Sequence, residues 1–207
     1  TGVQTCALPI FGLLLAVMRL SKHKALSRTA QTYVWTFRGT PLLVQLIIIY
    51  TGLPQLGLVR FSVLESAILG LALNEAAYLS EILRGGILSV AKGQTEAARA
   101  LGLKPYAIFR LVVLPQALRV IIPPLGNSVN GLLKTTSIAS VISMEEVLRR
   151  GQILMQQKFQ VLEVFIVVAI LYLVMTTCWD FVQRRIEAYY GRAYGAVENK
   201  QMARDDH

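Results

Sequence analysis

Long apolar runs separated by short polar segments constrain this chain more than any other feature of its sequence. The clearest run, residues 161–179, is close to the roughly 20 apolar residues that a helix needs to cross a bilayer. Further apolar runs cover residues 42–50, 62–83 and 120–142. The sequence therefore predicts an all-α, polytopic membrane protein rather than a soluble domain.

The charge of the chain does not indicate nucleic-acid binding. The formal net charge is +9, which would fit a nucleic-acid partner in a soluble protein. However, 54% of the residues are hydrophobic, and a soluble domain of this size would not expose such long apolar runs. The basic residues gather in some polar segments and are sparse in others, which fits the positive-inside rule for membrane proteins.

The distribution of basic residues predicts an orientation. Segments 19–38, 92–119 and 184–192 are rich in Lys and Arg and are expected to be cytoplasmic. Segments 52–60 and 145–158 are expected outside, although the second carries basic residues as well.

The two ends of the chain differ from the rest. Residues 1–10 are expected to be truncated or foreign sequence, and residues 11–20 the surviving end of a first transmembrane helix. The apolar run 6–18 is too short to cross a bilayer, and no basic segment precedes it as in a signal peptide. Residues 191–207 are polar and are expected to form a flexible cytoplasmic tail.

A polar segment, residues 94–115, separates two apolar runs and is predicted to form two short helices with a turn. Gly102 suits a left-handed C-terminal cap, and Pro105 suits the first turn of the second helix. Pro115 is expected to end or kink that helix. Three apolar residues at helical spacing predict one apolar stripe: Ile108, Leu111 and Val112.

This segment resembles the EAA loop of the permeases of ATP-binding-cassette (ABC) importers, which has the form E-A-A, three residues, G, nine residues, I-x-L-P. The matching positions are Glu96, Ala97, Ala98, Gly102, Val112, Leu114 and Pro115. Only Val112 departs from the pattern, since the family has Ile there. The alternative is an ordinary amphipathic hairpin between two spans.

Three other segments resemble the polar amino acid branch of these permeases. The resemblance extends over residues 11–190 and lies in the following positions: Tyr33, Phe37, Arg38, Gly39, Thr40, Pro41 and Gln45; Ala77, Tyr78, Glu81, Arg84, Gly85, Gly86, Gly93 and Gln94; Gln116, Ala117, Pro123, Pro124, Asn127, Lys134, Thr136 and Ser137. Without the resemblance, the first group indicates only a helix capped by Thr40, with Pro41 in its first turn.

The resemblance implies a permease domain over residues 11–190, with five spans and a coupling loop at 92–115, in the bacterial inner membrane. It implies a second permease subunit, identical or not, two ABC ATPase subunits inside, an extracytoplasmic solute-binding protein and a polar amino acid as substrate. The chain has no G-x-x-x-x-G-K-[ST] motif, so ATP is expected to be hydrolysed by a partner. The EAA residues would couple the spans to that ATPase.

Several polar residues inside predicted spans are candidates for a solute path. Asn74, Glu75 and Tyr78 lie within residues 62–83, where ionisable groups are costly unless they face a cavity or a partner. Asn74 and Glu75 are equally consistent with hydrogen bonds that join neighbouring helices, and Glu81 fits that role better. Lys134 is a candidate for transport or packing, in a stretch that Pro123 and Pro124 are expected to break.

Other classes of function remain open. The chain has two histidines and two distant cysteines, and no motif of a hydrolase or a dinucleotide-binding enzyme, so no catalytic residue, metal or cofactor is expected. An ABC permease for another small solute, such as methionine or phosphonate, is one alternative. An ATPase-independent channel or a membrane enzyme is the other.

Overall fold

The fold was analysed in a computed structural model that describes the backbone of residues 2–205 and the side chains of residues 10–190. Within these residues every regular element is helical, which confirms the all-α prediction. The terminal segments 1–10 and 191–207 fall mostly outside the described side chains, so their assignment as foreign sequence and flexible tail stays a prediction.

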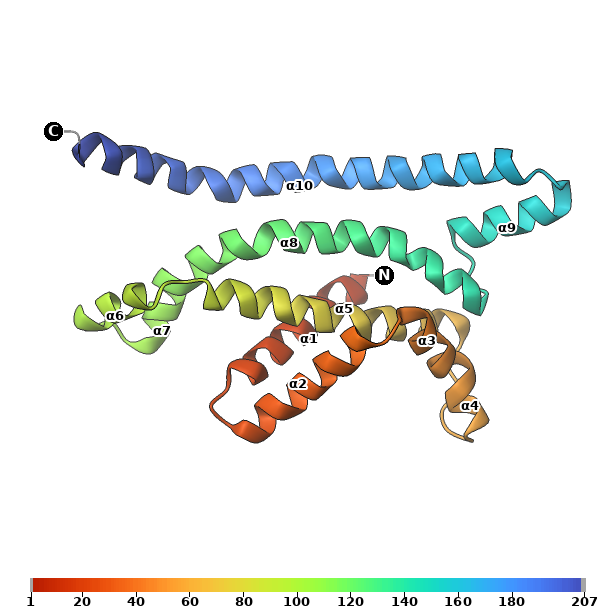
Figure 1. Ribbon diagram of the computed structural model, residues 1–207, viewed down its shortest axis with the longest axis horizontal. Helices are drawn as coiled ribbons and strands as arrows, with labels where there is room; N and C mark the ends of the chain where they lie inside the picture. The colour runs from red at the N-terminus through yellow and green to blue at the C-terminus, as the bar shows by residue number, and fades with distance from the viewer. Residues whose placement is uncertain (1, 206–207) are drawn as a thin grey trace.

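Three long helices run alongside one another, as Figure 1 shows. They are α5 (Val63–Leu88), α8 (Leu114–Thr135) and α10 (Val161–Asp205), and α8 packs between the other two. The start of α5 is fixed by a capping box, in which Ser62 accepts from the Glu65 N–H and Glu65 accepts from the Ser62 N–H. These three helices are the frame on which the polar sites are built.

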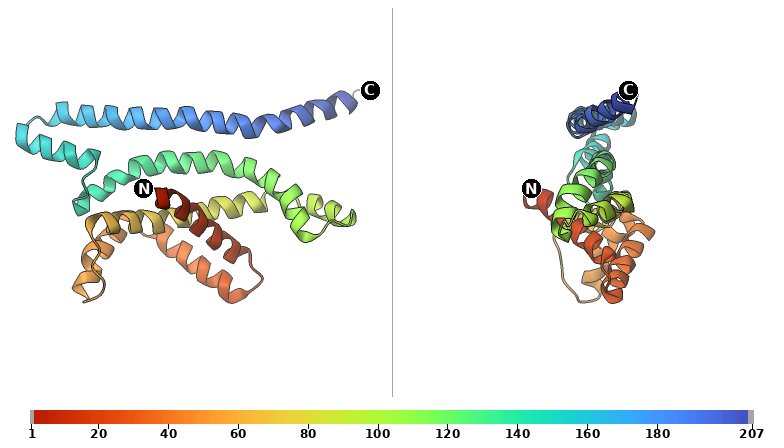
Figure 2. Two further views of the ribbon diagram at one scale, coloured as in Figure 1. Left: turned by 180° about the vertical axis from the view of Figure 1, so that it is seen from behind. Right: turned by 90° about the vertical axis from the view of Figure 1, so that its left-hand side faces the viewer.

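Helices α1 (Gly2–Leu20) and α2 (Lys24–Gly39) form a hairpin that crosses α5 on the side away from α10 (Figure 2). Leu15, Ala30 and Ala76 form the buried centre of this crossing. The basic segment 19–38 is therefore not one loop, because α2 carries Arg38 about 20 Å along its axis from Lys24.

A short bent segment follows α2 and lies at the same end of the molecule as α9 (Val147–Lys158). It comprises α3 (Leu42–Ile47), a π-helical turn (Ile48–Gly52) and α4 (Leu53–Gln55), and it is bent by 103° from α2. The sequence predicts that Thr40 caps the helix that follows it, and this prediction is wrong. Pro41 occupies the N-cap position of α3, and Thr40 ends α2.

The expectation that Pro123 and Pro124 break the helix is wrong. Helix α8 continues through both, and irregular backbone begins only at a 3₁₀ segment, Thr136–Ile142. Each proline removes a backbone hydrogen bond and costs about 3 kcal/mol in an isolated helix. The packing of α8 between α5 and α10 offsets this cost, as neighbouring helices do for proline in other transmembrane helices.

Two continuous helical stretches in the described chain, residues 105–142 and 161–190, are long and apolar enough to cross a membrane. The bent pair formed by α2 and the segment Leu42–Gln55 would be a third. Helix α5 is long enough, but it carries charged residues, and the described apolar part of α1 is shorter than a span. The chain is thus a helical membrane protein, while the count of five spans stays a prediction.

Candidate functional site

The first candidate site is the polar hairpin formed by α6 (Lys92–Ala100) and α7 (Pro105–Ile108), at one end of the long helices (Figure 1). Its turn is a Schellman motif: the Leu103 N–H bonds to the Ala98 carbonyl at 3.2 Å and the Gly102 N–H bonds to the Arg99 carbonyl at 2.9 Å. Gly102 has φ +78°, which confirms the predicted left-handed cap.

The hairpin has a small apolar core of its own. Ala98 is buried there against Ile108 and Val113, and α5 contributes Ile87. Ala98 is therefore small because the loop itself needs a small residue at this position, whereas Ala97 and Glu96 are exposed and free to meet a partner.

A π-helical turn, Phe109–Val113, changes the predicted apolar stripe. Leu111 is 64% exposed and Val113 is buried in its place, because the wider turn shifts the residues that follow it around the helix axis. The helix does not end at Pro115, since this proline lies in the first turn of α8 directly after the π turn. Leu114 and Pro115 thus join the hairpin to α8.

The outward surface of the hairpin combines apolar and basic side chains. Leu101 is 81% exposed and Tyr106 is 72% exposed, at the tip of a segment that is otherwise polar. Arg99, Lys104 and Arg110 are exposed around them. Exposed apolar groups with a polar rim are typical of a protein interaction site.

The second candidate site is a cavity of about 550 Å³ between the end of α2, the middle of α5 and α8. It is lined by Arg38, Gly39, Thr40, Pro41, Leu42, Asn74, Glu75, Tyr78, Ser128, Gly131, Leu132 and Thr135. The structure thus brings three of the four predicted path residues, Asn74, Glu75 and Tyr78, to one cavity. Lys134 is exposed and does not line it.

Asn74 combines the two roles that the sequence left open, because it both lines the cavity and joins helices. Its Nδ2 donates to the Phe37 carbonyl at 3.0 Å and to the side chain of Gln45 at 3.1 Å. Gln45 is buried, and its Nε2 also donates to the carbonyls of Phe37 and Thr40. These amides satisfy carbonyls that the end of α2 leaves without helical partners.

Glu75 and Tyr78 occupy different parts of the cavity wall. The carboxylate of Glu75 accepts a hydrogen bond from Ser128 of α8, so it also links two helices. The Tyr78 ring lies under the guanidinium of Arg38, whose Cζ is 5.2 Å from the ring centroid.

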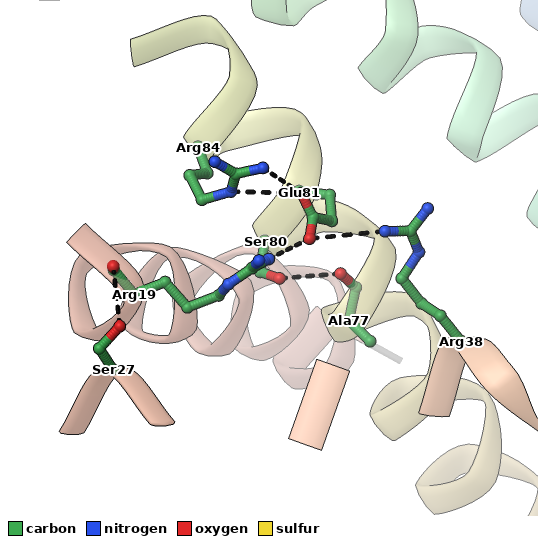
Figure 3. A network of polar contacts seen from close by, with 7 residues as sticks. All are labelled: Arg19, Ser27, Arg38, Ala77, Ser80, Glu81 and Arg84. Carbon is green, nitrogen blue, oxygen red and sulfur yellow. Dashed lines mark hydrogen bonds and ion pairs between the residues drawn. The ribbon is translucent and has the colours of Figure 1, made fainter. Parts of the chain in front are cut away.

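One turn further along α5, Glu81 is the centre of an ion-pair network (Figure 3). Arg19 of α1 bonds to one carboxylate oxygen, and Arg84 bonds to the other at 2.9 Å. Arg38 of α2 lies 3.5 Å from the oxygen that Arg19 uses. Glu81 therefore joins α1, α2 and α5, in agreement with the helix-joining role expected for it.

A second cavity, of about 410 Å³, lies beside this network. The two cavities adjoin each other, since Arg38, Gly39 and Tyr78 line both. The sequence analysis missed Arg38 and Arg19 as site residues. Arg38 was named only among the positions that resemble the permease family, and Arg19 was named only as part of a basic segment.

Together, a polar cavity between membrane helices and a compact polar hairpin with an exposed apolar tip define a solute permease that works with a partner. Residues 9–190 match the model of the family described as binding-protein-dependent transport system inner membrane component. The chain belongs to this family.

Relatives and a solved structure agree with this assignment. The nopaline transport system permease protein NocM of Agrobacterium fabrum is 45% identical over 170 residues, covering 78% of this chain and 70% of NocM. The octopine transport system permease protein OccM of Rhizobium meliloti is 42% identical over 182 residues, covering 84% and 73%. The crystal structure of an amino acid ABC transporter with histidines has a TM-score of 0.84 at 36% identity, covering 90% of this chain and 87% of that one.

Membership of the family establishes the role of the chain within a larger assembly. It is the permease component of an ABC transporter, which functions with a second permease subunit and with ATPase subunits. ATP hydrolysis takes place in those separate subunits, so this chain is not itself an enzyme.

Proposed function

We propose that this chain forms part of the path for a polar amino acid in a bacterial inner-membrane importer, which receives its solute from an extracytoplasmic binding protein. The observation that carries the proposal is the 550 Å³ cavity, which places a cation, Arg38, and a carboxylate, Glu75, among polar side chains of three helices. A zwitterionic solute offers both charges. Relatives named for the transport of nopaline and octopine support the same class of solute.

The α6–α7 hairpin is the proposed docking site for the ATPase subunit. The Schellman turn and the buried Ala98 make the hairpin a small rigid body. Exposed residues at its tip, Leu101 and Tyr106, provide apolar contact area, and Glu96 and Ala97 are accessible beside them. Gly102 provides the left-handed turn of the hairpin, and Leu114 and Pro115 join the hairpin to α8.

Reconstituted transport tests the proposal. The permease, its ATPase and the binding protein encoded alongside are placed in vesicles, and ATP-dependent uptake of labelled amino acids is measured. Uptake of polar amino acids is the expected result. Uptake of methionine or a phosphonate alone would give the alternative solute class, and uptake without the ATPase would indicate a channel.

Glu75→Gln tests the cavity within that assay. The amide oxygen still accepts a hydrogen bond from Ser128, so the complex should assemble normally, while the loss of the charge should change solute uptake. Unchanged uptake together with unchanged stability would remove Glu75 from both proposed roles.

A further inference from the structure

We infer that Arg38 binds the carboxylate of the transported solute and that its contact with Glu81 holds it in place for this purpose. This inference rests on the proposed function, since it assigns a residue to the recognition of an amino acid in the cavity. The observations that carry it are the charge balance around Glu81, the position of Arg38 between two cavities, and its exposure.

The charges around Glu81 do not balance. Three guanidinium groups, those of Arg19, Arg38 and Arg84, surround a single carboxylate in the described structure. One carboxylate neutralises one of these cations, so the cluster carries two positive charges in excess. Such an excess among membrane helices is costly unless water or an anion compensates it.

Among the three arginines, Arg38 presents the most exposed side chain to a second anion. Its side chain is 43% exposed, compared with 14% for Arg19 and 31% for Arg84. Its 3.5 Å approach to Glu81 is longer than the 2.9 Å contact of Arg84, and it shares its oxygen with Arg19. Figure 3 shows Arg38 reaching Glu81 from the side opposite Arg84.

Arg38 lines the proposed solute cavity. It is the only cation among the described residues that line the 550 Å³ cavity, and neither Arg19 nor Arg84 lines it. A guanidinium has five donors in a planar fork that matches a carboxylate in two parallel hydrogen bonds. The contact with Glu81 leaves most of these donors available.

Neighbouring groups complete the recognition of an amino acid. The Tyr78 ring lies against the Arg38 guanidinium and also lines the cavity. Glu75 is the only carboxylate that lines the same cavity in the described residues, and it suits the solute ammonium group. Asn74 is already bonded to the end of α2, so it is less available to the solute.

The test is direct solute binding to the purified permease–ATPase complex, without the binding protein. The probes are three amino acids paired with the amines that lack their carboxylate: L-histidine with histamine, L-arginine with agmatine, and L-glutamine with 4-aminobutanamide. The wild-type complex should bind at least one amino acid more tightly than its amine. In Arg38→Gln, this preference should fall roughly 10- to 100-fold, the range expected when a charged hydrogen bond is lost.

Arg84→Gln is the matched control, because it removes a cation from the same carboxylate but not from the cavity. It should keep the preference for the amino acid. Arg38→Lys keeps the charge but not the planar fork, and should lie between wild type and Arg38→Gln. Co-purification of the ATPase and the melting temperature of each variant show that the complexes are folded.

Each outcome decides between specific possibilities. Equal loss of preference in Arg38→Gln and Arg84→Gln, or an unchanged preference in a folded Arg38→Gln complex, overturns the role of Arg38 while the proposed function stands. If no amino acid binds to the wild-type complex or is taken up in vesicles, the proposed function and this inference both fail.

A lipid phosphate offers Arg38 similar chemistry, so the binding measurement is repeated in nanodiscs of phosphatidylcholine with and without phosphatidylglycerol. Solute affinity should be the same in both. If Arg38→Gln removes the effect of the anionic lipid but keeps the preference for the amino acid over its amine, Arg38 binds the lipid headgroup and the inference is overturned.

Discussion

At the scale of single residues, side-chain amides satisfy the backbone where α2 ends. The carbonyls of Phe37 and Thr40 accept from Gln45, and Asn74 of α5 donates to Phe37 as well. This arrangement holds α2 and α3 in place at a bend of 103°. Removing the Asn74 amide leaves the side-chain oxygen of the buried Gln45 without its donor, while the Phe37 carbonyl keeps its bond from Gln45.

Asn74→Leu should therefore destabilise the permease complex by about 1–3 kcal/mol, the cost of an unsatisfied buried polar group. Thermal unfolding of the purified complex measures the effect. Gln116→Leu is the control, because the Gln116 amide bonds only to Val112 of its own helical stretch and should cost less. Equal melting temperatures for wild type and Asn74→Leu would show that this amide does not hold the bend.

At the scale of helices, close approach between α5 and α8 depends on one of two adjacent glycines. A Cβ atom on Gly86 would lie 2.2 Å from Cγ1 of Ile121 and 3.2 Å from the Ala117 carbonyl oxygen, whereas a Cβ on Gly85 meets nothing within 4 Å. The two positions provide a matched pair for testing how the helices pack.

Gly86→Ala should destabilise the complex by roughly 1–3 kcal/mol, as overpacking of a close interface does. Gly85→Ala should be neutral or stabilising by up to about 1 kcal/mol, since alanine favours the helix and space is available. Melting temperatures of the two variants check the difference. If Gly85→Ala is the more harmful change, α5 and α8 do not cross as described.

The turn between α6 and α7 makes a separate prediction at this scale. Gly102→Val forces a branched side chain into φ +78°, at a cost of roughly 1–2 kcal/mol, and should reduce ATPase binding without preventing membrane insertion. Gly102→Asn should be milder, because Asn tolerates this backbone region better. Co-purification of the ATPase with each variant is the measurement, and full binding by Gly102→Val would contradict the role of the hairpin.

At the scale of the whole molecule, the orientation of the chain remains to be tested by labelling. In a background without Cys6 and Cys178, Lys104→Cys on the hairpin should be protected from a membrane-impermeant thiol reagent in intact cells. Leu56→Cys, at the other end of α5 and 74% exposed, should react. The opposite pattern would invert the topology.

Local features of the fold were predictable from the sequence, and features that depend on distant contacts were not. The hairpin was predicted correctly because Gly102 and Pro105 determine its turn through their own backbone preferences. The continuity of α8 through Pro123 was missed because tertiary packing overrides local propensity there.

In the candidate site, too, local features were predictable and contacts between distant residues were not. The polar face of α5, with Asn74 and Tyr78, follows from helical periodicity and could be predicted. Arg19 and Glu81 lie 62 residues apart in sequence, and no spacing rule joins two residues at that distance. The π turn at Phe109–Val113 likewise leaves no mark in the sequence pattern, so Leu111 was placed on the apolar stripe.

The small core of the hairpin has a mechanical consequence. The cluster around Ala98 includes Ile87 in the last turn of α5 and Val90 just after it. It also includes Val112 and Val113, in the π turn directly before α8. A displacement of α6 is therefore transmitted directly to α5 and α8, because all three elements share this apolar cluster. We expect the hairpin and the adjoining ends of α5 and α8 to move as one rigid body. This movement would change the width of the cavity between α5 and α8.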